Sequence, residues 1–268
     1  MPVSTRGALQ IDTMDAGTGA ALVLLHSSAS GAHQWQALAA AMPDRRVIAP
    51  NLYGYGETSP WPGPASQTIA DQAALVLATL EDVEGPIDLV GHSFGALIAL
   101  ETATMLGGRA GRLVMHEPNP FALLHRPGAE EAWRIVQDLH AHVRAAYLRG
   151  DWHGAAGRFA DFFSGPGTWD AMPAARRAAL AVSLPPNLHE WDAMMDPSLR
   201  PDRWDAMRAP TLLTFARDTA PPLRALAEIL LADHPSWRAE EIPHGGHMAP
   251  LTRPRAFNGV ALGFLAAG

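Results

Sequence analysis

The stretch "DLVGHSFGALIAL", residues 88–100, joins two apolar runs of different period around one serine. Before the serine the apolar residues are contiguous, as in a buried strand, and after it they recur at the spacing of one helix face. Gly91 and Gly95 flank Ser93, and without a Cβ they let the helix pack close to the strand while the serine takes a strained conformation. The pattern predicts that the Ser93 hydroxyl stands exposed at a helix N-terminus, as a nucleophile would.

Outward from this stretch, short apolar runs alternate with helix-like segments along most of the chain. Strand-like runs lie at residues 21–26, 46–51, 87–93, 112–118, 210–216 and 237–243. Helices are predicted near residues 32–42, 67–82, 94–103, 221–232 and 254–266. This alternation is typical of an α/β fold with a mostly parallel sheet covered by helices on both faces. Residues 8–15 are candidates for an antiparallel hairpin at one edge.

Residues 119–202 break the alternation. They contain no convincing strand but several tryptophans, and turn-forming stretches at 164–167 and 184–187 divide them into short helical pieces. We interpret the segment as a helical cap inserted over the carboxyl ends of the strands, where open α/β sheets bind ligands. The alternative is an ordinary helical layer. The predicted division is a first core part at 1–118, the cap, and a second core part at 203–268.

The composition excludes several classes of protein and site. All 20 basic residues are arginine, which excludes P-loops, Schiff-base lysines and Ser-x-x-Lys acyl-enzymes. Cysteine is absent, and with it disulfides, thiolate nucleophiles and cysteine metal sites. The net charge of −7 gives no general attraction for nucleic acid. No apolar window is long enough for a membrane span, and the first residues lack a signal-peptide core, so we expect a cytoplasmic protein.

A serine nucleophile needs a base, and "EIPHGGHMAPLTRP", residues 241–254, offers His244 and His247. We favour His247, because the glycines before it allow a close approach and His244 lies nearer the strand end. The two histidines have H-x-x-H spacing, but no carboxylate completes a zinc motif, so no metal is expected.

Two carboxylates at strand ends are candidates for orienting that imidazole. Asp218 follows the penultimate strand and is the preferred acid, although aspartate there could simply cap a helix. Glu117 follows the strand after the serine and is the alternative acid, although it could instead bond to loop amides.

An oxyanion hole needs two backbone N–H groups that point at the developing negative charge. Phe94, directly after the nucleophile, should donate one. We expect Ser28, in the turn "HSSASGAHQW" at residues 26–35, to donate the other, with Ser27 as the alternative. A plain serine-rich turn would explain the same residues without a catalytic role.

With these motifs in place, the chain resembles the α/β-hydrolase family over nearly its full length. The resemblance is carried by the turn from His26 to Trp35, "PNLYGYGETSP" (50–60), "GHSFG" (91–95), the insertion after "VMHEP" (114–118) and "GGHM" (245–248). The chain order Ser93, Asp218, His247 is also the family's order. The resemblance implies an eight-stranded, mostly parallel sheet, a helical cap and a catalytic triad that needs no cofactor.

The chain departs from the family pattern at three positions. Ser27 replaces the usual glycine of the oxyanion turn, and Asn51 replaces an aspartate after the second parallel strand. Glu117 occupies the position where some haloalkane dehalogenases carry their triad acid. Those enzymes need an aspartate nucleophile, so Ser93 argues against dehalogenation and epoxide hydrolysis.

These observations predict a serine hydrolase that cleaves a small or medium apolar carboxylic ester through an acyl-enzyme. A lactonase, thioesterase, amidase or carbon–carbon bond hydrolase is the alternative on the same residues. A lyase or acyltransferase and a non-catalytic ligand receptor are further alternatives. The expected partner is a small-molecule substrate, with no cofactor, metal, nucleic acid or membrane, in a monomer or homodimer.

Overall fold

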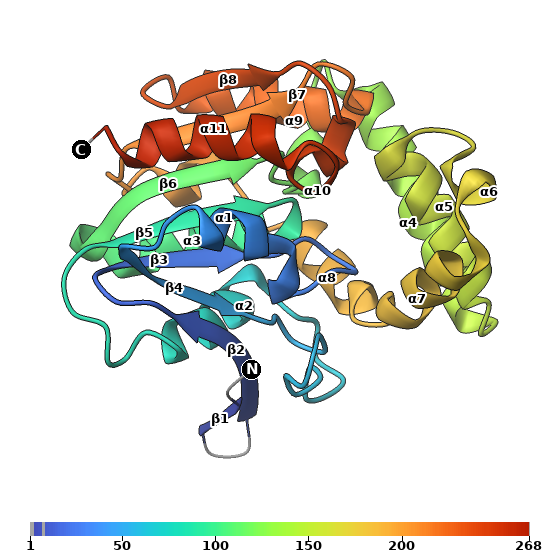
Figure 1. Cartoon of the computed structure of the whole chain (residues 1–268). Helices are drawn as coiled ribbons and strands as arrows, with labels where there is room; N and C mark the ends of the chain where they lie inside the picture. The colour runs from blue at the N-terminus through green and yellow to red at the C-terminus, as the bar shows by residue number, and fades with distance from the viewer. Residues whose placement is uncertain (1–2, 7–8, 268) are drawn as a thin grey trace.

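The computed structural model describes residues 3–6 and 9–267. Within them, eight strands follow the order β1-β2-β4-β3-β5-β6-β7-β8 (Figure 1). They are β1 (Val3–Arg6), β2 (Leu9–Ala16), β3 (Ala20–Leu25), β4 (Arg45–Pro50), β5 (Ile87–His92), β6 (Ala110–His116), β7 (Thr211–Ala216) and β8 (Arg238–Ile242). Strands β3 to β8 pair only in parallel among themselves, whereas β2 is antiparallel to both of its neighbours. The predicted α/β fold with a mostly parallel sheet is confirmed.

The body of the sheet is the seven strands β2 to β8, and β1 pairs with β2 alone. Strands β1 and β2 form the antiparallel edge expected near residues 8–15, although residue 8 itself lies outside the described residues.

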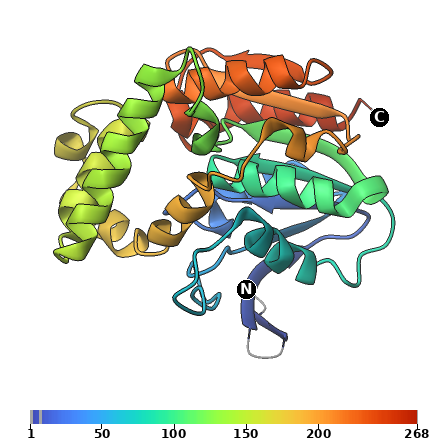
Figure 2. The ribbon, with the colours of Figure 1, turned by 180° about the vertical axis from the view of Figure 1, so that it is seen from behind.

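Helices cover both faces of the sheet, because successive strand residues point to opposite sides. Leu22 and Leu24 of β3 pack with α1 (Gln36–Ala40) and α11 (Pro254–Leu265). Val23 and Leu25 belong to the larger buried cluster on the other face, which α2 (Ile69–Ala78), α3 (Phe94–Leu106) and α9 (Pro221–Asp233) cover (Figure 2). Apolar side chains buried on both faces explain why the strands read as nearly continuous hydrophobic runs.

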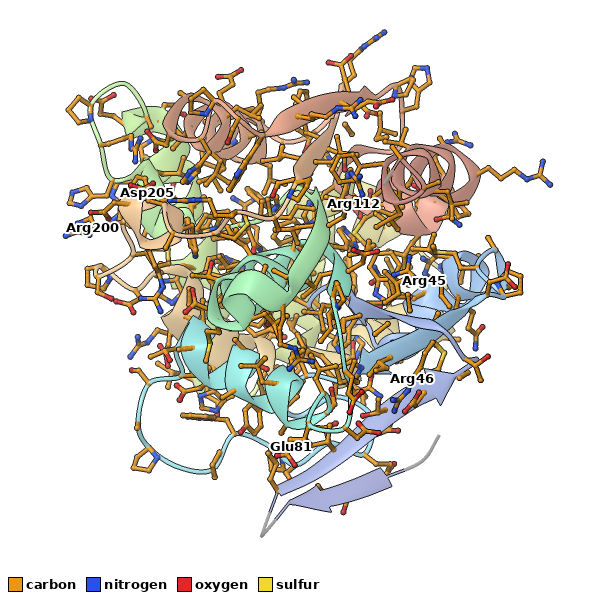
Figure 3. All side chains as sticks on the ribbon, turned by 90° about the vertical axis from the view of Figure 1, so that its left-hand side faces the viewer. Arg45, Arg46, Glu81, Arg112, Arg200 and Asp205 are labelled. Carbon is orange, nitrogen blue, oxygen red and sulfur yellow. The ribbon has the colours of Figure 1, made fainter. Side chains whose placement is uncertain are left out.

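Arginine side chains tie the amino ends of three strands together, away from the loops that carry the site. Arg45, at the start of β4, donates to the carbonyls of Ala20 and Ala21 at 2.8 and 2.9 Å and to Asp88 of β5 at 2.7 Å. Its neighbour Arg46 pairs with Asp15 of β2 at 2.7 Å; Figure 3 labels both arginines. These arginines thus supply hydrogen-bond donors to carbonyl and carboxylate groups at this end of the strands.

Residues 119–202 are described throughout and contain helices but no strand. They form α4 (Glu130–Leu148), α5 (Trp152–Ser164), α6 (Thr168–Ala171), α7 (Ala174–Ser183) and α8 (Asn187–Met194), with a 3-10 helix at Phe121–Leu124 before them. A further 3-10 helix, Pro201–Trp204, leads back to β7. In Figure 1 these helices stand beyond the ends toward which the parallel strands point.

Aromatic rings give the helical segment its own packing. Trp191 of α8 stacks on Phe121 with ring centroids 5.5 Å apart, and Phe159 packs on Phe163 within α5 at 4.6 Å. Just after the segment, Arg203 and Trp204 donate hydrogen bonds to Glu101 of α3 at 2.8 and 3.2 Å, which ties the returning chain to the sheet layers.

Candidate active site

Ser93 occupies the turn between β5 and α3. Its backbone has φ 58° and ψ −124°, a conformation that L-residues rarely adopt. A Cβ on Gly95 would lie 2.3 Å from the carbonyl oxygen of His26, and one on Gly91 would lie 2.4 Å from the carbonyl oxygen of Gly95. The two glycines are therefore required for the close packing that holds the strained serine in place.

A hydrogen-bonded line joins Ser93, His247 and Glu117. Ser93 Oγ lies 2.8 Å from His247 Nε2, and His247 Nδ1 lies 2.8 Å from Glu117 Oε2. These three residues come from the loops after β5, β8 and β6, and all are at most 3% exposed. Each nitrogen of the imidazole thus has one partner, and the arrangement can transfer a proton away from the serine hydroxyl.

The Glu117 carboxylate is held from several sides. Its Oε1 accepts the Ala216 N–H at 2.8 Å, and its Oε2 accepts the Thr219 hydroxyl at 2.7 Å as well as the imidazole. Burial raises the pKa of Glu117, whereas the bonds from Ala216 and Thr219 oppose this rise. Glu117 also has a positive φ of 46°, which turns its side chain toward His247 at a conformational cost.

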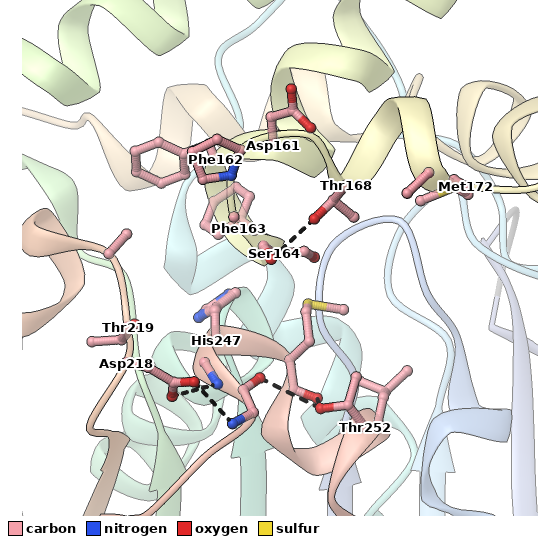
Figure 4. A pocket seen from close by; sticks show the side chains of 18 of the residues that line it. Asp161, Phe162, Phe163, Ser164, Thr168, Met172, Asp218, Thr219, His247 and Thr252 are labelled. Carbon is pink, nitrogen blue, oxygen red and sulfur yellow. Dashed lines mark hydrogen bonds between the residues drawn. The ribbon is translucent and has the colours of Figure 1, made fainter.

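Asp218, the preferred acid in the sequence analysis, does not contact the imidazole. Its carboxylate instead accepts the N–H groups of Gly246 at 2.9 Å and Gly245 at 3.3 Å (Figure 4). These bonds stabilise the loop that presents His247. The structure therefore corrects the expected contact: Glu117, the alternative, occupies the place beside His247, and Asp218 shapes the loop. His244, the other candidate base, is exposed.

The protonation state of His247 follows from its surroundings. Burial lowers the pKa of His247 below its ordinary value, so the ring is neutral near pH 7. A carboxylate can only accept at Nδ1, so the single ring proton resides there and Nε2 is left to accept from Ser93. This is the tautomer that a general base requires.

In the turn at residues 26–35, the two candidate backbone donors differ: the Ser28 N–H is unoccupied and the Ser27 N–H is already bonded. Ser27 gives both its N–H and its hydroxyl to Gln34 Oε1, at 3.1 and 3.0 Å. No hydrogen bond is found for the Ser28 N–H among the described residues. Phe94 begins α3, so its N–H has no acceptor within the helix. The N–H groups of Phe94 and Ser28 thus remain without an acceptor in the described residues, whereas that of Ser27 is already bonded.

Gln34 and His92 connect the turn at residues 26–35 to the loop that carries His247, and neither is among the predicted site residues. Gln34 Nε2 lies 3.0 Å from His92 Nδ1, and His92 Nε2 lies 2.7 Å from the carbonyl oxygen of His247. Because Gln34 Oε1 accepts from Ser27, its amide N–H must donate to His92, whose Nε2–H then donates to His247. His92 adjoins the serine in the sequence, but Gln34 has no motif that distinguishes it.

A buried carboxylate of α8 faces the oxyanion turn. Glu190 accepts from Asn187 at 2.8 Å and lies near the Ser28 and Tyr55 side chains, while Tyr55 accepts the Ala29 N–H at 3.0 Å. Burial raises the pKa of Glu190, and the bond from Asn187 and the nearby hydroxyls act in the opposite direction. The helical segment therefore contributes to the shape of the oxyanion turn.

A cavity of about 1000 Å³ reaches His247 from the side of α5 to α7. Phe163 covers the imidazole, with ring centroids 4.7 Å apart, and Phe162, Met172 and Thr219 also line the cavity (Figure 4). The cavity walls thus come from the helical segment on one side and from the loops after β7 and β8 on the other.

The described residues show neither a cluster of metal-ligating side chains nor a membrane-spanning helix. No group of three histidine, aspartate or glutamate side chains there is placed to hold an ion. Among the described helices, none has both the length and the apolar character needed to span a bilayer.

Comparison with known proteins gives partial matches in sequence and full-length matches in fold. A 2-hydroxy-6-oxo-2,4-heptadienoate hydrolase of Pseudomonas putida is 33% identical over 153 residues, which are 52% of this chain and 55% of that protein. Protein phosphatase methylesterase 1 of Bos taurus is 37% identical over 92 residues, 32% of this chain and 24% of that protein. The chain thus spans about half, or less, of the length of these curated relatives.

Among solved structures, the α/β-hydrolase enzyme MGS-M2 from a Medee basin deep-sea metagenome library has a TM-score of 0.80. The comparison covers 100% of this chain and 98% of that chain at 17% identity, so it shows the fold alone. The sequence profile of the alpha/beta hydrolase family matches residues 22–260, which is most of the chain. This protein therefore belongs to the alpha/beta hydrolase family.

Proposed function

We propose that the protein hydrolyses a small or medium carboxylic ester through an acyl-enzyme on Ser93. The observation that carries the proposal is the buried line from Ser93 Oγ through His247 to Glu117, with both contacts at 2.8 Å. A serine hydroxyl becomes nucleophilic when a positioned base takes its proton, and the carboxylate stabilises the imidazolium that forms.

The reaction proceeds in two halves. Ser93 Oγ bonds to the ester carbonyl carbon while its proton moves to His247 Nε2, and the N–H groups of Phe94 and Ser28 bind the oxyanion. His247 then gives this proton to the leaving alkoxide oxygen as the carbon–oxygen bond breaks. Water enters, His247 takes one of its protons, and the resulting hydroxide displaces Ser93, which recovers its proton as the acid leaves.

We further propose that residues 119–202 act as a cap that excludes water and selects the substrate. The contact of Phe163 with His247 and that of Glu190 with the oxyanion turn support this role. Phe162 and Met172 along the cavity favour an apolar substrate group.

The test is labelling with a fluorophosphonate, together with turnover of p-nitrophenyl acetate and butyrate. We expect the wild-type protein to be labelled and active, and Ser93→Ala to lose both properties while its thermal unfolding stays close to that of the wild type. Absence of labelling in the wild type would favour a non-catalytic receptor. Turnover retained by Ser93→Ala would show that Ser93 is not the nucleophile.

One relative supports a second candidate function. The Pseudomonas putida relative is named for an unsaturated oxo acid rather than an ester. Cleavage of a carbon–carbon bond beside a keto group would use the same serine and histidine. The test incubates the protein with 2-hydroxy-6-oxo-2,4-heptadienoate and monitors the loss of the substrate's absorbance. Consumption faster than that of the esters would favour this candidate, and no consumption would reject it.

A further inference from the structure

Asn119 lies against the nucleophile, and neither the sequence motifs nor the proposed reaction gives it a role. Its Nδ2 is 3.3 Å from Ser93 Oγ, and the residue is 1% exposed. Pro118 and Pro120 flank it and restrict its backbone. Its carbonyl oxygen accepts the Phe121 N–H at 2.8 Å, and Phe121 stacks on Trp191 of the cap. Asn119 is therefore held in one position beside the serine.

The hydrogen bonds at Ser93 determine which way the Asn119 amide faces. His247 carries its proton on Nδ1, so the Ser93 hydroxyl must donate to Nε2. The serine oxygen then has only lone pairs to offer Asn119, and the NH₂ end of the amide must face it. The opposite end, Oδ1, points elsewhere, and this buried atom has no hydrogen-bond partner among the described residues.

An amide oxygen buried without a donor is unfavourable, because it has lost its bonds to water and gained none in the protein. Sites built to bind a substrate hydroxyl contain such an acceptor, and they discriminate strongly against analogues that lack the donor. A buried, unpaired acceptor next to a nucleophile thus points to a ligand group that donates.

Elimination assigns that donor to one part of the substrate. The oxyanion would face the Phe94 and Ser28 amides, and the leaving oxygen would face His247. The remaining substituent of the carbonyl carbon is the acyl chain. Asn119 contacts Ser93 but binds neither the oxyanion nor the leaving oxygen, so the acyl chain is the group left to face it.

We infer that Asn119 selects esters whose acyl group carries a hydroxyl on the carbon next to the scissile carbonyl, with Oδ1 accepting the hydroxyl hydrogen. This inference rests on the proposed function, whose substrate class it narrows to 2-hydroxyacyl esters. The Nδ2 of the same side chain directs the Ser93 hydroxyl toward His247. Asn119 thus has two separable effects, one on substrate choice and one on the nucleophile.

The experiment compares p-nitrophenyl esters of single-enantiomer 2-hydroxybutanoate and 2-methoxybutanoate with the butanoate ester. The hydroxyl and methoxy groups withdraw electrons similarly, and each rate is divided by that of hydroxide-catalysed hydrolysis. We expect the wild type to favour the hydroxy ester over the methoxy ester by about tenfold in kcat/KM, the discrimination typical of one buried hydrogen bond. Asn119→Leu should reduce this ratio to within about twofold of one.

Asn119→Asp separates the two effects, because aspartate keeps an acceptor but loses the donor to Ser93. We expect kcat to fall on all three esters while the preference for the hydroxy ester persists. Asn258→Leu, on α11, is the control and should change neither quantity. Urea denaturation checks that each variant is folded.

Two results would overturn the inference without affecting the proposed function. One is a wild-type protein that turns over the butanoate ester but shows no preference between the hydroxy and methoxy esters. The other is an unchanged preference in Asn119→Leu. Failure of the proposed function is distinguishable, because the wild type would then cleave no ester and would not react with a fluorophosphonate.

Discussion

Neutralising Glu117 should be far more damaging to activity than neutralising Asp218, although both carboxylates follow parallel strands. The two substitutions are Glu117→Gln and Asp218→Asn, and each replaces one carboxylate oxygen by an NH₂ group of similar size. In the first variant, the amide oxygen can still accept the Ala216 N–H, which leaves the NH₂ group facing His247. That group donates to Nδ1 and drives the ring proton to Nε2, so the imidazole can no longer accept from Ser93.

The magnitude follows from this change of tautomer. The equivalent carboxylate-to-amide change in serine triads lowers kcat by about 10⁴-fold, or about 5 kcal/mol in the activation free energy. Asp218→Asn loses much less, because its amide oxygen can keep the 2.9 Å bond from Gly246 and only the longer bond from Gly245 is lost. One such hydrogen bond is worth about 1 kcal/mol, so kcat should fall by about fivefold at most.

The assay is steady-state turnover of p-nitrophenyl butyrate at pH 8, with urea denaturation of each variant to establish that it is folded. Asp218→Asn is the matched control, since it removes the same charge near the same loop. The reasoning would be refuted if Asp218→Asn lost more than about 100-fold in kcat while Glu117→Gln stayed within about tenfold of the wild type.

Three further predictions concern packing, stability and pH. Gln34→Leu should lower the free energy of unfolding by about 2 kcal/mol, because it leaves buried groups of Ser27 and His92 unpaired; an unchanged urea midpoint would contradict this. Gly95→Ala should cost about 3 kcal/mol or prevent folding, since its Cβ would lie 2.3 Å from a backbone oxygen, and thermal unfolding measures the loss. Burial lowers the pKa of His247, so kcat/KM should be nearly constant from pH 8 to 6.5 and fall only at lower pH as the imidazole gains a proton; a half-maximal value at pH 7 or above would contradict it.

The fold could be predicted largely from sequence, because periodicity and glycine placement act locally. Contiguous apolar runs marked the buried strands, and the change of period at Ser93 marked the junction of β5 and α3. The helical segment at 119–202 could be recognised by its lack of strand-like runs, but its contacts could not. Stacking of Trp191 on Phe121 joins residues far apart in the chain, and no local pattern encodes that pairing.

The local sequence determined which side chains could reach the carboxyl edge of the sheet: a serine at a glycine-flanked turn, a histidine in a glycine loop and two strand-end carboxylates. Only the tertiary structure decided between those carboxylates. β6 and β7 are neighbours, so both acids arrive at the same edge, and the choice depends on backbone and side-chain direction. The positive φ of Glu117 turns its carboxylate to the imidazole, whereas loop N–H groups hold the Asp218 side chain. Side-chain direction depends on hydrogen-bond partners distant in sequence, and these meet only when the chain has folded.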